Sequence, residues 1–231
     1  MNKASNIIRH NLKTRLNILT PDYRLYETSW NQAFANALFL RKFILACLFI
    51  LINLYLFPFF FAYIQQRPGI QLHDIVLSQL PSHDVSVTIF SVIYFSVIIG
   101  IRRALKYPQL FLNFMYAYII LNLVRMTTMF LVPLEPPIGL VRLTDPLLVP
   151  FYGKTSITKD LFFSGHTSTV FLVLLIVTEK WEKILMMVSV VVVAVLLLVQ
   201  HIHYTIDVVS APFFVFVIYV FAKKVAAVKL L

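Results

Sequence analysis

Charged residues are scarce in this sequence of 231 residues: they make up 13% of it, whereas about 25% is usual in soluble proteins. Apolar residues make up 60%, more than a soluble domain of this length could bury. Glycine is rare, with five residues, which excludes collagen-like and low-complexity sequences. The single cysteine, Cys47, excludes an intrachain disulfide and a cysteine-based metal site. We therefore expect an integral membrane protein.

Six apolar segments approach the length of about 20 residues that a helix needs to cross a bilayer. They cover residues 37–64, 86–101, 108–132, 161–178, 184–200 and 206–222. The second and fourth segments are short, so we expect each to extend into its polar flank. The predicted fold is all-α: a polytopic membrane protein with six transmembrane helices in a single domain, residues 37–231.

Residues 1–36 are polar and mixed in charge, without the short apolar core of a cleavable signal peptide. We expect them to form a cytoplasmic leader. Tyr23, Tyr26 and Trp30 could place an interfacial helix in this leader, just before the first span.

Lysine and arginine are distributed unevenly between the two sides that six spans define. Fifteen lie in the segment up to Lys42, in the second and fourth loops and in the C-terminal tail. Four lie in the opposite loops: Arg67, Arg142, Lys154 and Lys159. The positive-inside rule then places both termini in the cytoplasm. The net charge of +10 fits contact with anionic lipid, so the membrane, and not nucleic acid, is the expected partner.

Two polar clusters fall at span ends on the outer, extracytoplasmic side. The first is Asp160 with Ser164-Gly165-His166-Thr167, where the fourth span begins. The second runs from His201 to Asp207, between the fifth and sixth spans. The assignment of sides used only lysine and arginine, so the common depth of the two clusters is an independent observation. Ionisable groups are costly in a bilayer, and we therefore look for function here.

His203 and Asp207 are four residues apart, so on a helix their side chains share one face. A carboxylate beside an imidazole fixes its tautomer and raises its basicity, which makes His203 a candidate nucleophile toward phosphorus. His166 is then a candidate general acid or base. Arg125, in the outer third of the third span, could bind a phosphate through two donors.

Each of these residues also has a structural interpretation. A histidine near a span end is usually interfacial, and this is what we expect of His10, His73 and His83. Asp160 could be a helix cap, Arg125 a snorkelling residue and Glu135 a solvated loop residue, while the role of His201 stays open. His201 and His203 would need strand geometry to bind one metal ion, so no metal site is expected.

The two clusters resemble the most specific motifs of the sphingomyelin synthase family, a branch of the type 2 phosphatidate phosphatase superfamily. The resemblance covers about residues 70–220. Its strongest parts are Asp160 with Ser164-Gly165-His166-Thr167, and His203-Tyr204-Thr205-Ile206-Asp207-Val208. Arg125-Met126-Thr127-Thr128-Met129 followed by Pro133 and, more faintly, residues 72–81 are also similar. The resemblance implies six helices with both termini in the cytoplasm.

The resemblance implies a lipid phosphotransferase that works through a phosphohistidine. His203 would attack the phosphorus of a glycerophospholipid, Asp207 would orient it, and His166 would protonate the departing diacylglycerol and then deprotonate the acceptor. The donor would be phosphatidylcholine or phosphatidylethanolamine, and the acceptor a lipid alcohol such as ceramide. The expected substrate-binding residues are Arg125, Asp160, Ser164 and Tyr204. No cofactor and no metal is implied.

Two departures from the family pattern leave alternatives open. Thr158-Lys159 stand where the family often has Cys-Gly. Leu196-Leu197 occupy the Ser-Arg positions of the phosphatase branch, which favours the synthase branch. Hydrolysis with water as acceptor, a proton-coupled transporter and a lipid-binding protein without catalysis are the other interpretations. Whether the chain forms a homo-oligomer is left open.

Overall fold

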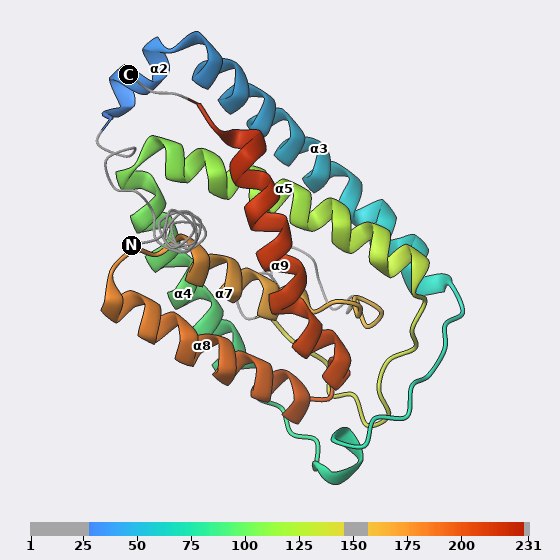
Figure 1. The fold of residues 1–231 in the computed structure, drawn as a ribbon. Coiled ribbons are helices and arrows are strands. Elements are labelled where there is room, and N and C mark those ends of the chain that lie inside the picture. Colours follow the sequence, from blue (N-terminus) through green and yellow to red (C-terminus); the bar gives the residue numbers. More distant parts are fainter. Residues whose placement is uncertain (1–27, 146–156, 229–231) are drawn as a thin grey trace, which may run out of the picture.

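The protein is all-α in the computed structural model, which describes residues 28–145 and 157–228 (Figure 1). The α-helices of these ranges are α2 (Trp30–Ala35), α3 (Ala37–Gln66), α4 (Ser86–Lys106), α5 (Pro108–Leu131), α7 (Gly165–Ile176), α8 (Lys180–Val199) and α9 (Thr205–Ala226). A 3-10 helix, η2, covers Leu77–Gln79. The described ranges contain no strand, only an isolated parallel bridge between Ile70 and Leu134. The predicted fold class is confirmed.

Within the described ranges, five helices are long and apolar enough to cross a membrane: α3, α4, α5, α8 and α9. The second predicted span does extend into its flank, because α4 continues to Lys106. The fourth does not: α7 has 12 residues, or about 18 Å at 1.5 Å per residue, against a hydrocarbon core of about 30 Å. The six-span count therefore stays a prediction.

Consecutive long helices run in opposite directions between two ends of the bundle. At one end, the Lys42 Nζ at the start of α3 donates to the carbonyl oxygens of Val225 and Ala227 at the end of α9, over 2.7 and 2.9 Å. Arg103 at the end of α4 meets Glu182 at the start of α8. The described chain therefore begins and ends at one end of the bundle, which we call the basic end.

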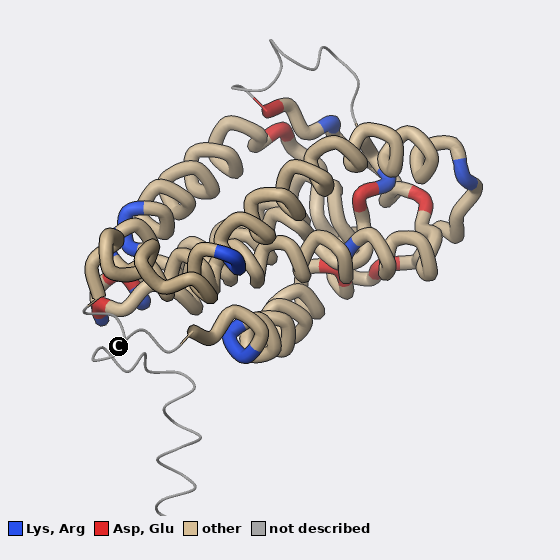
Figure 2. Tube along the Cα trace, turned by 90° about the horizontal axis from the view of Figure 1, so that it is seen from above, with Lys and Arg blue, Asp and Glu red and all other residues tan. Residues whose placement is uncertain are grey.

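Charged residues gather toward the two ends of the bundle (Figure 2). The lysines and arginines at the basic end are Arg41, Lys42, Arg102, Arg103, Lys106, Lys180, Lys183, Lys223 and Lys224. The opposite end, called the loop end, carries the connections after α3, α5 and α8. Which side of the membrane each end faces stays a prediction. Tyr23, Tyr26 and Lys154, on which parts of the sequence argument rested, lie outside the described residues.

Helix α7 is the centre of the bundle, in contact with α4, α5, α8 and α9. Leu172 and Ile176 on one face pack into a buried cluster with α5 and α9. Val170 and Val173 on another face pack into a second buried cluster with α4 and α8. Helix α3 contacts α5 and the short α2 and exposes most of its apolar surface. A short central helix inside longer ones places its first residue in the interior.

The basic end holds a buried ion pair whose loss should destabilise the fold. Arg103 Nη2 and Nε donate to the two oxygens of Glu182 over 2.7 and 3.0 Å, and these side chains are 11% and 4% exposed. Glu182→Leu should lower the free energy of unfolding by about 3–5 kcal/mol, because the largely buried Arg103 charge loses its close partner and keeps only the half-exposed Glu179. Unfolding of the purified protein in detergent micelles measures this.

Glu179→Leu is the matched control. Glu179 lies 3.4 Å from the same arginine, but its side chain is 50% exposed. Its replacement should cost less than about 1 kcal/mol. Equal losses in the two variants would contradict the assignment of the buried pair.

Candidate active site

The chain enters α7 through a non-helical segment that lies inside the bundle. Two carbonyl groups of this segment receive side-chain donors from α5. Arg125 Nε donates to the Phe163 oxygen over 3.0 Å, and the Thr128 hydroxyl donates to the Phe162 oxygen, also over 3.0 Å. Non-helical backbone at membrane depth is tolerated where protein groups satisfy it. These bonds explain why the helix starts at residue 165 and not at 161.

Ser164 ties the start of α7 to the start of α9. Its hydroxyl accepts a hydrogen bond from the Thr167 N–H over 3.3 Å, which makes it the N-cap. Its own N–H donates to the backbone oxygen of Asp207 over 3.1 Å. These bonds bring His166 next to His203: their ring centroids are 6.0 Å apart, and the ring planes are inclined by 64°. The two predicted histidines therefore do converge.

Asp207 lies beside His203 as predicted, although His203 precedes α9 and is not on the same helix. The distance from His203 Nδ1 to Asp207 Oδ2 is 3.5 Å, and the two side chains are 1% and 0% exposed. This is close enough for an ion pair but longer than a direct hydrogen bond. The same oxygen accepts the Tyr204 N–H over 3.0 Å. Asp207 therefore caps the first turn of α9 and faces the histidine with one carboxylate.

The guanidinium of Arg125 lies between three groups at the start of α7. Besides the Phe163 oxygen, it forms an ion pair with Asp160. It also lies flat against Gly165, where an added Cβ would be 2.5 Å from Arg125 Cζ. A glycine is therefore required here for the arginine to approach the helix. Arg125 is 9% exposed, and its charge is paired inside the bundle.

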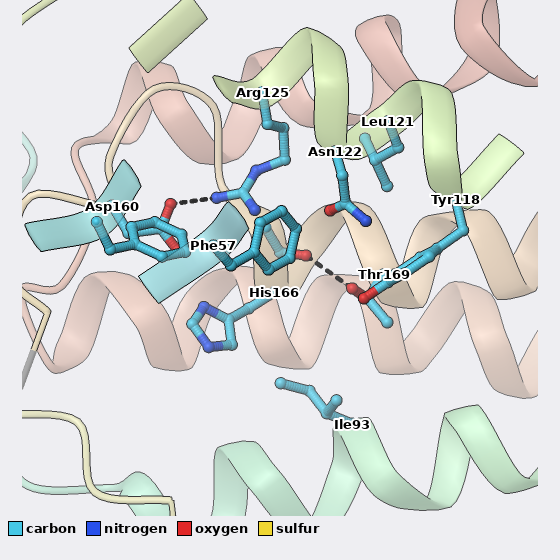
Figure 3. Close-up of a pocket in the computed structure, with 11 residues that line it drawn as sticks. Phe57, Ile93, Tyr118, Leu121, Asn122, Arg125, Asp160, His166 and Thr169 are labelled. Atoms are coloured by element: carbon cyan, nitrogen blue, oxygen red, sulfur yellow. Dashed lines mark hydrogen bonds and ion pairs between the residues drawn. The ribbon is translucent and has the colours of Figure 1, made fainter. Parts of the chain in front are cut away.

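A cavity of about 240 Å³ opens beside these groups (Figure 3). Its lining comes from α3, α4, α5, α7 and the segment before α7: Phe57, Phe61, Ile93, Tyr118, Leu121, Asn122, Arg125, Asp160, Gly165, His166 and Thr169. Arg125, Asp160 and His166 form one polar end, and Phe57 with Ile93 belongs to the apolar wall (Figure 3). A guanidinium, although paired with Asp160, and an imidazole at one end of a cavity with an apolar wall suit a phosphate group attached to a lipid.

Of the seven residues predicted from the sequence, five lie together. His166, Arg125 and Asp160 line the cavity, and His203 with Asp207 lies next to His166, outside the lining. The other two hold the backbone: Ser164 caps α7, and the buried Tyr204 hydroxyl donates to the Glu135 oxygen and accepts from the Leu72 N–H. Contact of Ser164 or Tyr204 with substrate stays a prediction.

Glu135 connects the loops around the site, which the sequence did not indicate. Its Oε1 accepts from the Gly69 N–H over 2.8 Å and from Lys159 Nζ over 2.7 Å. Lys159 also donates to the Arg67 oxygen over 2.7 Å. The hydrogen bond from Lys159 lowers the pKa of the Glu135 carboxyl, partly opposed by burial. Glu135 is therefore an ion-paired connector of the loops, although its side chain is 33% exposed.

Asp74 and His201 also form hydrogen bonds that connect the loops around the site. Asp74, in the faint motif of the first loop, accepts from the backbone and hydroxyl of Thr205 over 2.6 and 3.0 Å and so holds the start of α9. His201 has a positive φ of 54°, and its ring nitrogens lie 2.9 and 3.0 Å from the carbonyl oxygens of Ile138 and Leu80. His201 thus joins two loops and lies outside the cavity lining.

Comparison with known proteins supports a superfamily. Residues 159–224, which include His166, His203 and Asp207, match the family described as PAP2 superfamily C-terminal. The match supports the type 2 phosphatidate phosphatase superfamily and, in general terms, chemistry of the phosphatase or phosphotransferase type on lipid phosphates. Among curated proteins, none matches the chain. The superfamily that the motifs resemble is thereby supported, while the branch within it stays a prediction.

Gly165→Ala tests whether the position of Arg125 matters for activity. The added Cβ would push the guanidinium away from Phe163 and Asp160. We expect turnover of a lipid-phosphate substrate to fall by about 100-fold, the loss typical of a misplacement of about 1 Å. The measurement is turnover per folded molecule in detergent or liposomes.

Gly100→Ala is the control, because its Cβ would meet Val173 at 3.0 Å in the helix packing, away from the cavity. That variant should change stability but not turnover per folded molecule. If the two variants lose turnover equally, Arg125 is not the cause.

The Glu135–Lys159 pair predicts a pH dependence of stability. Because the folded-state pKa of Glu135 is lowered, its contribution is fully present above the ordinary glutamate pKa of about 4.3 and is lost as the pH falls through the lowered value. Lys159→Met should therefore be less stable than the wild type near neutral pH. The difference should shrink in acid. Unfolding curves at several pH values measure it, and a constant difference would contradict the pairing.

Proposed function

We propose that the chain is a membrane lipid phosphotransferase. It moves a phospho-head group from a glycerophospholipid to a lipid alcohol such as ceramide, through a phosphohistidine, and releases diacylglycerol. The observation that carries this proposal is the convergence of His166 and His203 at 6.0 Å between ring centroids, with the buried Asp207 carboxylate 3.5 Å from His203. The superfamily match and the synthase-like motifs support it.

In the first half-reaction, the phosphate of the donor lipid lies against Arg125 at the polar end of the cavity. His203 presents Nδ1 to Asp207, so Nε2 is its nucleophilic nitrogen. This nitrogen attacks phosphorus and the bond to the glycerol oxygen breaks. His166 gives that oxygen a proton and diacylglycerol leaves. Asp207 stabilises the positive charge that develops on the His203 ring.

In the second half-reaction, His166 takes the proton of the acceptor hydroxyl. The oxygen attacks the phosphohistidine, and the bond from phosphorus to His203 breaks, which regenerates both histidines. Arg125 offsets the charge on the phosphoryl oxygens throughout. His203 is 1% exposed and lies next to His166 but outside the cavity lining, so the phosphate must approach it from the side of His166.

Two observations support transfer to a lipid alcohol over hydrolysis. Leu196 and Leu197, at the Ser-Arg positions of the phosphatase branch, pack in the apolar cluster around α8. No second phosphate clamp comes from these positions. The cavity wall is also mainly apolar (Figure 3). Water as acceptor is the alternative, and the distribution of lysine and arginine supports a site on the extracytoplasmic side.

His203→Ala and Asp207→Asn test the mechanism. Purified protein with labelled phospholipid should yield diacylglycerol, together with labelled ceramide product when ceramide is present. His203→Ala should abolish both products. Asp207→Asn keeps the oxygen that caps α9 but loses the charge, so turnover should fall on the order of 10³–10⁴-fold with the fold intact.

His73→Ala is the control, since His73 is an exposed loop histidine that should tolerate replacement. Full turnover by His203→Ala would contradict a phosphohistidine intermediate on this residue. If the rate of diacylglycerol release does not depend on ceramide and free phospho-head group accumulates, the reaction is hydrolysis and not transfer.

A further inference from the structure

Asn122 is a buried polar residue of the cavity that the catalytic steps do not use. It lies on α5 three residues before Arg125, so the two side chains share a helix face. It is 6% exposed, and within the described part of the chain its Nδ2 has no hydrogen-bond partner. Figure 3 shows its amide beside the Arg125 side chain, directed into the cavity.

Two other buried amide donors in the apolar helices, Gln109 Nε2 and Asn53 Nδ2, are bonded within the protein, whereas the Gln109 Oε1 acceptor has no partner among the described residues. Asn113 accepts from Gln109 Nε2 over 2.9 Å, and Asn53 donates to the Phe49 oxygen over 2.8 Å. A buried donor without a partner costs about 1–3 kcal/mol, and water is scarce at this depth. An unpaired donor that faces a cavity therefore points to a ligand that carries an acceptor.

The depth of Asn122 in the bilayer indicates which part of a bound lipid it would contact. Its Cα lies about 4.5 Å from that of Arg125 along the helix axis, at 1.5 Å per residue, in the direction of the basic end and the bilayer centre. A phospholipid with its phosphate at Arg125 and His166 has its glycerol backbone next in that direction. The two ester carbonyls attached to this backbone are hydrogen-bond acceptors and have no donor.

We propose that Asn122 Nδ2 binds an ester carbonyl of the donor lipid, in a subsite that favours ester-linked diacyl lipids. This inference rests on the proposed function and names the part of the substrate that the cavity holds below the phosphate. The bond fixes the glycerol unit, and with it the oxygen that leaves toward His166. Asn122 is thus a substrate-positioning residue and takes no part in proton transfer.

The test compares two lipids that share head group and chain length: a diacyl phospholipid and its dialkyl ether analogue, which lacks both carbonyls. The wild type should favour the diacyl lipid by about threefold to tenfold in kcat/KM, the effect of one hydrogen bond. Asn122→Leu is similar in size but has no donor. Its kcat/KM for the diacyl lipid should fall to the ether value, with the ether rate unchanged.

Asn113→Leu is the control: it removes a buried amide from the same helix, outside the cavity lining. It should change stability and keep the diacyl preference. Asn122→Ala serves as a second variant if the leucine variant does not fold. If a folded Asn122 variant keeps the preference for the diacyl lipid, the proposed subsite is wrong. It is also wrong if kcat/KM falls equally for both lipids, because the amide then does not bind an ester carbonyl.

A binding measurement separates this inference from the proposed function. Lipid retained by the purified protein can be quantified by native mass spectrometry after exchange into equal amounts of the two lipids. Retention that favours the diacyl lipid in the wild type and loses this preference in Asn122→Leu supports the subsite even if no turnover occurs. Equal retention in the wild type overturns the subsite, whereas absent turnover overturns only the phosphotransferase.

Discussion

The bonds of Arg125 to the segment before α7 are the contacts on which the site depends. Backbone groups at membrane depth need partners from the protein, and the Phe163 carbonyl finds one in Arg125 Nε. The same guanidinium pairs with Asp160 and lies against Gly165. A snorkelling arginine would extend to the interface, whereas this one is 9% exposed and paired within the bundle. It holds the short helix in place and supplies the positive charge of the cavity.

Asp207, like Arg125, makes several of the contacts that form the site. Its carboxylate caps α9 through the Tyr204 N–H, lies beside His203, and its backbone oxygen receives the Ser164 N–H. The starts of α7 and α9 are therefore joined through one residue, which fixes the distance between the two histidines. Because fold and proposed chemistry share these contacts, loss of activity on mutation is informative only per folded molecule. A substitution that keeps the cap, such as asparagine, separates the two roles.

Much of this arrangement could be predicted from the sequence, and the failures have a common cause. Apolar length predicted α3, α5, α8 and α9 to within a few residues. His203 and Asp207 do lie close together, although His203 precedes α9 and the two therefore do not share a helix face as predicted. The length of α7 was wrong, because α5 satisfies the carbonyls before it, about 35 residues away in the sequence. The connector role of Glu135 was missed for the same reason, since its partners Gly69 and Lys159 come from two other segments. Asn122 could have been noticed as a polar residue inside an apolar span.

The burial of His203 bears on the choice between water and a lipid alcohol. A phosphohistidine is hydrolysed wherever water reaches it, so a transferase must keep the intermediate dry until the acceptor arrives. His203 is 1% exposed and does not line the cavity, and the cavity wall includes Phe57, Ile93 and Leu121. An acceptor that enters from the membrane brings its own apolar chains and can fill such a cavity, whereas water finds no hydrogen-bond partners at the apolar wall. The burial of the nucleophile therefore supports an acceptor drawn from the lipid phase.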